Sequence, residues 1–342
     1  DRFGKKPLFY ASINSKFIFA SEMKAIFLFM KKVAPSNDFH WMKNNPFLYE
    51  GTEKCLIDGI KRFPSGHNAI FKDGKLSLFR YWNTLDHIEK VNLSYDEQVE
   101  KFRELFFDAC RLRMRSDVPI SATLSGGLDS SSVLAGINHN ANGSFDIKNN
   151  FQVFIASFPG SQIDETKYAK KVVNHFDFKD NYIDINPMKQ WDKLDHFLYL
   201  FEELYITSPI PMIMTYGGIR DHNIKVSIDG HGADELFSGY GHVLEAILDA
   251  GLNINRISEV SDIYMDTLGD FSKGRKFNKT KLITLFLIKK VLRKILNKEA
   301  ISIDNKHSEY NKLDNFSKQL YLIFHQTTIP TIIRNFDRYS MI

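Results

Sequence analysis

The chain has 342 residues, enough for about two domains. Its 45 basic and 41 acidic side chains nearly balance, so the composition gives no reason to expect a nucleic-acid partner. With 43% hydrophobic and 25% charged residues, it has the profile of a soluble globular protein and excludes disordered and fibrous chains. The two cysteines, Cys55 and Cys110, are too few for a disulfide framework or a cysteine-rich zinc module.

Residues 1–85 are expected to form a β-rich domain. Short strands are predicted at 8–10 and 17–20 around a turn at Asn14-Ser15, followed by a helix over residues 22–26. A hairpin is predicted over residues 69–79, because Asp73-Gly74 suits the positive φ angles of a tight turn.

A different pattern begins after Trp82, and residues 95–342 are expected to form a second domain. A long helix is predicted over residues 95–115. Strands are then predicted at 119–124, 153–157, 181–185 and 225–228, with helical stretches between them. This alternation is typical of βαβ units, so we expect an α/β fold with a mostly parallel sheet.

The first candidate site is the loop after the strand at 119–124, which reads Ser-Gly-Gly-Leu-Asp-Ser from Ser125 to Ser130. Its glycines allow close approach of the backbone, and the N–H groups of the following helix would face an anion. Asp129 could bind Mg²⁺ on a polyphosphate. The lysine of the Walker A loop is absent, which favours holding released pyrophosphate over transferring a γ-phosphoryl group. A plain turn with Asp129 as a helix cap is the alternative.

A second loop of the same kind follows the strand at 225–228. Gly230 and Gly232 flank His231, and Asp234 could be a second magnesium ligand. Because ligands bind at the carboxyl ends of parallel strands, both loops are expected at one edge of the sheet. Considered without the first loop, Asp234-Glu235 would be interpreted as the solvent-exposed start of a helix, where acidic side chains interact favourably with the helix dipole.

Residues 273–298 contain ten Lys or Arg and no acidic residue. Apolar residues recur there at helical spacing, which predicts an amphipathic helix with a solvated basic face. Peripheral contact with anionic lipid or an acidic partner is the alternative. The longest apolar run, at 282–288, is too short to span a membrane. The first residues also lack the apolar core of a signal peptide, so a cytoplasmic location is expected.

The two loops together resemble the synthetase domain of glutamine-hydrolysing asparagine synthetases. Residues 1–10 and 19–25 resemble the late part of that family's glutaminase domain, an Ntn-type glutamine amidotransferase fold. Residues 157–160 and 329–341 resemble further stretches of its PP-loop synthetase domain. The resemblance implies adenylation of the aspartate side chain by ATP with Mg²⁺, followed by attack of ammonia, normally supplied by glutamine.

The resemblance also implies site residues. Leu124 and Ala156 would border the adenosine through main-chain contacts, with Asp229 and Gly230 on its other side. Asp129 and Asp234 would bind magnesium, and Arg338 would place a cation near the reacting phosphate. His231 stands where the family often has Glu, so it is expected to orient the substrate by hydrogen bonding and not to act as a carboxylate base. The pyrophosphate would be held by Ser125, Gly126, Gly127, Leu128, Asp129 and Ser130.

The family's glutaminase domain starts with a cysteine nucleophile, whereas this sequence starts with Asp1 and stops soon after Met341. We therefore expect a fragment truncated at both ends, unable to hydrolyse glutamine, with Cys55 and Cys110 as inert thiols. Two alternatives stay open: a related amide-forming synthetase, such as a β-lactam- or peptide-cyclising or polysaccharide-pathway enzyme, and an inactive scaffold. The sequence allows a homodimer and does not determine the oligomeric state.

Overall fold

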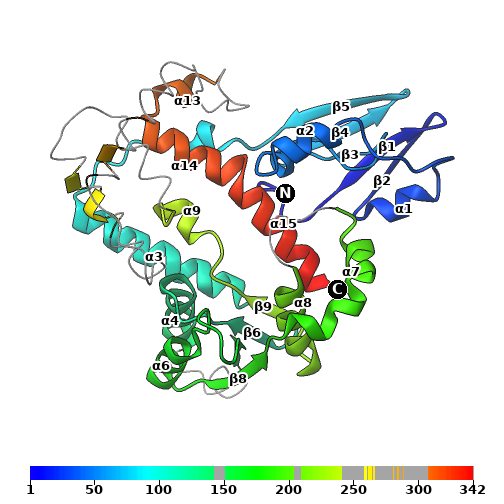
Figure 1. The fold of residues 1–342 in the computed structure, drawn as a ribbon. Coiled ribbons are helices and arrows are strands. Elements are labelled where there is room, and N and C mark those ends of the chain that lie inside the picture. Colours follow the sequence, from blue (N-terminus) through cyan, green and yellow to red (C-terminus); the bar gives the residue numbers. More distant parts are fainter. Residues whose placement is uncertain are drawn as a thin grey trace.

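The computed structural model describes residues 1–141, 151–203, 209–240 and 307–341, with a few isolated positions between 258 and 288. Figure 1 shows N-terminal strands in one part of the molecule and a parallel sheet with its helices in another. Helices α14 (Asn315–His325) and α15 (Thr328–Met341) run alongside both parts. The short helix α13 (Ser308–Lys312) precedes them.

The N-terminal part contains a small antiparallel sheet with the strand order β2-β1-β3. Its strands are β1 (Phe9–Ile13), β2 (Lys16–Ala20) and β3 (Lys61–Arg62). Asn14 and Ser15 connect β1 to β2 and both have positive φ, as a type I′ hairpin requires. Helix α1 (Met23–Phe27) buries Met23 and Ile26 against Phe9 of the sheet. The predicted strands and helix of this region are confirmed.

The predicted second hairpin is also present. Strands β4 (His67–Lys72) and β5 (Lys75–Arg80) pair antiparallel and turn at Asp73 and Gly74, both with positive φ. The remaining elements of the N-terminal part are short: α2 (Phe39–Asn44) and the 3₁₀ turns η1 (Tyr49–Gly51) and η2 (Thr84–His87).

The C-terminal part is built on a four-stranded parallel sheet with the order β8-β7-β6-β9, which confirms the predicted α/β fold. The strands are β6 (Ile120–Thr123), β7 (Gln152–Ser157), β8 (Lys179–Asp184) and β9 (Val226–Ile228). Helix α3 (Tyr95–Arg113) precedes the sheet. The segments between and after the strands include α4 (Leu128–Ala141), α6 (Thr166–Phe176), η3 (Pro187–Lys193), α7 (Leu194–Phe201), α8 (Pro209–Asp221) and α9 (Ala233–Phe237).

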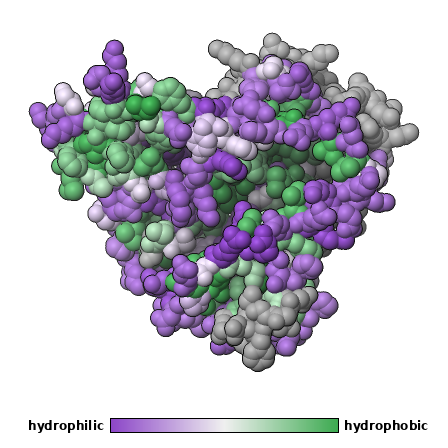
Figure 2. Space-filling model, turned by 180° about the vertical axis from the view of Figure 1, so that it is seen from behind, coloured by the Kyte–Doolittle hydropathy of each residue, from purple (hydrophilic) through white to green (hydrophobic). Residues whose placement is uncertain are grey.

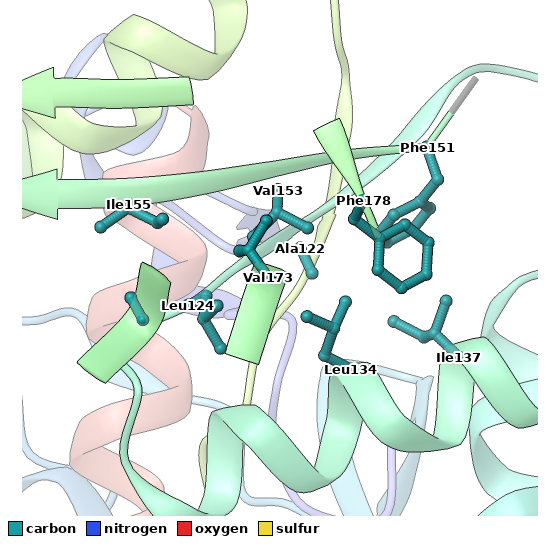
Figure 3. Packing of buried hydrophobic residues seen from close by; sticks show 10 residues of the cluster. Ala122, Leu124, Leu134, Ile137, Phe151, Val153, Ile155, Val173 and Phe178 are labelled. Carbon is teal, nitrogen blue, oxygen red and sulfur yellow. The ribbon is translucent and has the colours of Figure 1, made fainter. Parts of the chain in front are cut away.

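Helices cover both faces of this sheet because β7 is apolar on both sides. Val153 and Ile155 pack with Leu134 of α4 and Val173 of α6, as Figure 3 shows. Phe154, between them in the sequence, points to the other face and packs with Ile219 of α8. Successive side chains of a strand alternate between faces, so the result is a three-layer α/β/α arrangement.

Buried ion pairs join α15 to the N-terminal part. Glu203, just after α7, has a fully buried side chain that accepts two hydrogen bonds of 3.0 Å from Arg62 of β3. It also accepts from Arg334 of α15 and from the Tyr49 hydroxyl. Glu50 pairs with the same two arginines. The two carboxylates and two guanidinium groups balance in charge, as a buried cluster requires.

A second set of contacts forms around the neighbouring Glu202. Its carboxylate accepts from the N–H groups of Met23 and Lys24 at the start of α1, at 2.9 and 2.6 Å. It also accepts from Arg338 of α15 at 3.0 Å. Glu202 and Glu203, just after α7, thus bind both the N-terminal part and α15. These contacts fix α15 against the sheet domain.

The predicted basic helix at 273–298 lies outside the described residues, apart from isolated positions. Among the helices that the structure describes, none is long and apolar enough to cross a membrane.

Candidate active site

The loop between β6 and α4 is ordered by its own hydroxyl groups. The Ser125 and Ser130 hydroxyls lie 3.0 Å apart, and the Gly127 N–H donates to Ser125 Oγ at 3.2 Å. The Leu124 N–H donates to the Phe154 carbonyl of β7 at 2.9 Å, which ties the start of the loop to the sheet. Gly126 has φ +87° and lies against the backbone at the start of α6, where a Cβ atom would collide.

The loop and the start of α4 are open to solvent. Helix α4 begins at Leu128, and the first N–H groups of a helix lack partners within it. Ser125 and Leu128 have exposed side chains, while Asp129 and Ser130 are half-buried. Ala156 lies near the end of the neighbouring strand β7. The predicted phosphate-loop residues therefore gather at the carboxyl edge of the sheet.

The second loop touches the first through its backbone. A Cβ atom on Gly230 would lie 2.8 Å from the Ser130 nitrogen and 3.0 Å from the Asp129 carbonyl carbon. These distances are too short for a real Cβ atom, so the loop after β9 can pass the first turn of α4 only with glycine at this position. The predicted meeting of the two loops at one sheet edge is present in the structure.

Replacing Gly230 with alanine should therefore separate the two loops. We expect the variant to fold but to lose at least 10-fold in nucleotide-dependent activity, because misplacing catalytic groups by about 1 Å can cost about 100-fold. Gly217→Ala is the matched control, since a Cβ there meets only the far end of the Arg220 side chain, at 4.0 Å. Equal activity of the two variants, measured with matched circular dichroism spectra, would contradict this prediction.

Asp229 connects the strands behind the site. Its Oδ1 accepts from Thr123 Oγ1 at 2.7 Å and from Ser227 Oγ at 2.8 Å. Its Oδ2 accepts from the Tyr216 hydroxyl of α8. Three hydroxyl groups thus hold this carboxylate, and the expected place of Asp229 beside an adenosine stays a prediction. The partners Thr123, Ser227 and Tyr216 were not predicted, and a hydroxyl in a strand or helix has no sequence signal that distinguishes it.

Asp129 is influenced by the charges of two acidic residues of the second loop, Asp234 and Glu235. Burial raises the pKa of Asp129, and the charges of Asp234 and Glu235 raise it further. Within the described residues, no group of three or more His, Cys, Asp or Glu side chains is arranged to hold a metal ion. Two carboxylates nevertheless fit Mg²⁺, which proteins commonly bind through one or two carboxylates together with substrate phosphates and water.

The His231 side chain lies beside Asp229 and α15. Its Nδ1 is 3.9 Å from Asp229 Oδ2, and its ring centroid is 3.7 Å from that of Phe336. The side chain is 36% exposed and lines a cavity. Burial lowers the pKa of His231 more than Asp229, Glu235 and Asp129 raise it, which favours the neutral imidazole.

The cavity at this site has a volume of about 2320 Å³. Asp129, Asp229 and His231 line it at the sheet edge, and the segment containing Lys5 and Lys6 lines it on the N-terminal side. Figure 2 shows the molecule hollowed near the centre of one face, with apolar surface inside the hollow and polar surface around it. Its lining combines apolar residues with a few polar and charged groups, as ligand sites commonly do.

Arg338 lies apart from these residues. Its guanidinium donates to the Ser21 carbonyl and to Glu202, both at 3.0 Å, in the contact between α15 and the N-terminal part. Phe336 faces His231, and residues two apart on a helix point about 200° apart. In this structure Arg338 therefore lies on the side of α15 away from the loop that holds His231, and its expected place near a reacting phosphate stays a prediction.

Both cysteines are free, buried thiols. Burial raises the pKa of Cys55 and also that of Cys110. Since the thiolate is the reactive form, neither side chain is suited to act as a nucleophile, in agreement with the sequence-based expectation.

A parallel sheet with a Ser/Gly loop at its carboxyl edge is the arrangement of a PP-loop protein. Comparison with protein families agrees: residues 101–342 match the family described as asparagine synthase, and residues 1–82 match the glutamine amidotransferase domain. The chain belongs to the asparagine synthase family.

Three curated relatives illustrate the similarity. A putative asparagine synthetase 2 of Methanocaldococcus jannaschii is 29% identical over 248 residues, which cover 70% of this chain and 46% of the relative. Asparagine synthetase 3 of Bacillus subtilis is 30% identical, with 76% of this chain and 43% of the relative covered. The amidase chyE of Penicillium rubens is 27% identical, with 70% and 37% covered. The chain thus spans less than half the length of these relatives.

Proposed function

We propose that the protein forms amides from carboxylates with ATP, through an acyl-adenylate, and that its substrate is aspartate. The observation that carries this proposal is the close backbone approach of the two loops at the sheet edge, where Gly230 lies against Asp129 and Ser130. Membership of the asparagine synthase family supports the same reaction.

In this proposal the adenosine lies between the main chain at Leu124 and Ala156 and the loop at Asp229-Gly230. The triphosphate lies on residues 125–130, where N–H groups of α4 and the serine hydroxyls donate to phosphate oxygens. Asp129 and Asp234 would hold Mg²⁺, which neutralises charge on the leaving pyrophosphate when bound. The substrate carboxylate attacks the α-phosphorus, pyrophosphate leaves, and ammonia then displaces AMP to form the amide.

We further assign residues 1–85 to the end of a glutamine amidotransferase domain and residues 95–342 to the synthetase domain. The match of residues 1–82 to the amidotransferase family supports glutamine as the source of ammonia in the whole protein. The salt bridge between Lys6 and Asp337 and the contacts of Glu202 and Glu203 support a fixed arrangement of the two domains.

The experiment is pyrophosphate release by the purified chain with ATP, Mg²⁺ and ammonium, compared across a panel of carboxylates. We expect release that depends on the carboxylate and is fastest with aspartate. Faster release with another carboxylate would keep the reaction and reject aspartate, which the amidase-named relative makes a specific alternative. Absence of carboxylate-dependent release with every substrate would reject the reaction and favour an inactive scaffold.

A further inference from the structure

Two groups from different elements form walls beside the His231 imidazole. One wall is the Asp229 carboxylate, with 3.9 Å between Asp229 Oδ2 and His231 Nδ1. The other is the Phe336 ring of α15, tilted by 43° at a centroid distance of 3.7 Å. A side chain held between a carboxylate and an aromatic ring loses rotational freedom before any substrate arrives.

The two walls are themselves connected. The Phe336 ring meets the Tyr216 ring edge-on, with 6.4 Å between centroids, and the Tyr216 hydroxyl donates to Asp229. The same phenylalanine also contacts Tyr339 at 5.7 Å, within the core that α15 shares with α7 and α8. Displacing the Phe336 ring would therefore require movement of packed neighbours, so its position is well defined.

Helix α15 is in turn fixed along its length. Arg334 and Arg338 lie one turn apart and bind the buried Glu203 and Glu202. Phe336 lies between these two arginines in the sequence and points toward the other side of the helix. The buried ion pairs therefore hold the backbone from which the phenylalanine reaches His231.

The surroundings suit an imidazole better than a carboxylate. Asp229, Glu235 and Asp129 all act on position 231 with negative charge. The face of the Phe336 ring is also electron-rich and repels an anion placed over it. A neutral imidazole tolerates both walls and keeps a nitrogen available to a substrate in the cavity that it lines.

We propose that Phe336 is a positioning residue for His231, setting the direction in which the imidazole meets the acyl-adenylate. This inference rests on the proposed function for its role in the reaction. Phe336 does not itself need to touch the substrate, because its effect passes through the ring of His231.

The test is a double-mutant cycle with Phe336→Leu and His231→Ala in the full chain, read as carboxylate-dependent pyrophosphate release. Residues in contact show interaction energies that such cycles isolate. We expect Phe336→Leu to lower kcat about 10-fold when His231 is present and less than about 2-fold when position 231 is alanine. Equal losses in both backgrounds would show a merely structural role and overturn the proposal.

The matched control is Phe176→Leu. The rings of Phe176 and His175 in α6 lie 4.8 Å apart between centroids and neither lines the cavity, so the same substitution removes a phenylalanine–histidine contact away from the site. We expect this variant to retain wild-type kcat. A loss equal to that of Phe336→Leu would overturn the proposal.

A second readout does not depend on catalysis. The Phe336 ring should shift the carbon-bound protons of His231 upfield in the NMR spectrum, with the His231→Ala variant identifying the signals. Phe336→Leu should remove this shift and Phe176→Leu should retain it. An unchanged shift in Phe336→Leu would overturn the proposal, whereas absent pyrophosphate release by the wild type would reject the proposed function itself.

Discussion

Replacing Glu203 with leucine should destabilise the protein by about 3–5 kcal/mol, the usual cost of leaving a buried charge without its partner. The side chain of Glu203 is fully buried, and it binds Arg62, Arg334 and the Tyr49 hydroxyl. After the substitution, the buried guanidinium groups of Arg62 and Arg334 would lose their salt bridges to Glu203 and keep those to Glu50. The measurement is the free energy of unfolding in urea, followed by tryptophan fluorescence.

Glu104→Leu is the matched control for this prediction. Glu104 pairs with Lys101 on the surface of α3, where its side chain is 68% exposed. Loss of such a pair should change stability by less than about 1 kcal/mol. If Glu203→Leu lowered the free energy of unfolding by no more than Glu104→Leu does, the ion pairs between α15 and the N-terminal part would contribute little to stability, contrary to the structure.

Replacing Asp129 with asparagine should have opposite effects on activity and stability. Carboxylate-dependent pyrophosphate release should fall at least 10-fold, since changes even in residues that only support a metal ligand typically cost about 10- to 100-fold. Stability at neutral pH should rise, because Asp234 and Glu235 repel the ionised Asp129 and burial disfavours its charge. Thermal unfolding and pyrophosphate release of the same preparation measure both effects.

The pH dependence follows from the direction of the pKa shift. The pKa of Asp129 is raised in the folded state. Its ionised carboxylate therefore does not destabilise the folded protein below the ordinary aspartate pKa. The destabilising effect develops as pH rises through the raised value. The gain in stability of the Asp129→Asn variant over the wild type should therefore be larger at pH 7 than at pH 3. Asp96→Asn, in the first turn of α3, is the control and should leave activity unchanged. Lower stability of Asp129→Asn at pH 7 would contradict the assigned repulsion.

The sequence predicted the elements that carry the site because their signals are local. The strand before Ser125, the glycines after it and the helix start at Leu128 are adjacent in the chain, and so are the strand and loop around Gly230. The positive φ angles of Asn14 and Gly74 follow from short turns in the same way. The meeting of the two loops needed only the rule that parallel strands end at one sheet edge.

Contacts between distant segments could not be predicted in this way. Glu203, Arg62 and Arg334 come from three separate segments, and charged residues in isolation suggest exposed positions. The placement of Arg338 depends on the rotation of α15 about its axis, which packing against α7 and α8 determines. The contact of Phe336 with His231 depends on the same packing, so its role emerged only from the structure.

The most direct test of the central claim is transfer of ¹⁸O from a labelled carboxylate to AMP. Formation of an acyl-adenylate joins a carboxylate oxygen to the α-phosphorus, and displacement by ammonia leaves that oxygen on AMP. With ¹⁸O-labelled aspartate, ATP, Mg²⁺ and ammonium, we expect the AMP formed by the full chain to carry one ¹⁸O atom by mass spectrometry. Unlabelled AMP, or ADP and phosphate as the products, would contradict adenylation at the site between the two loops.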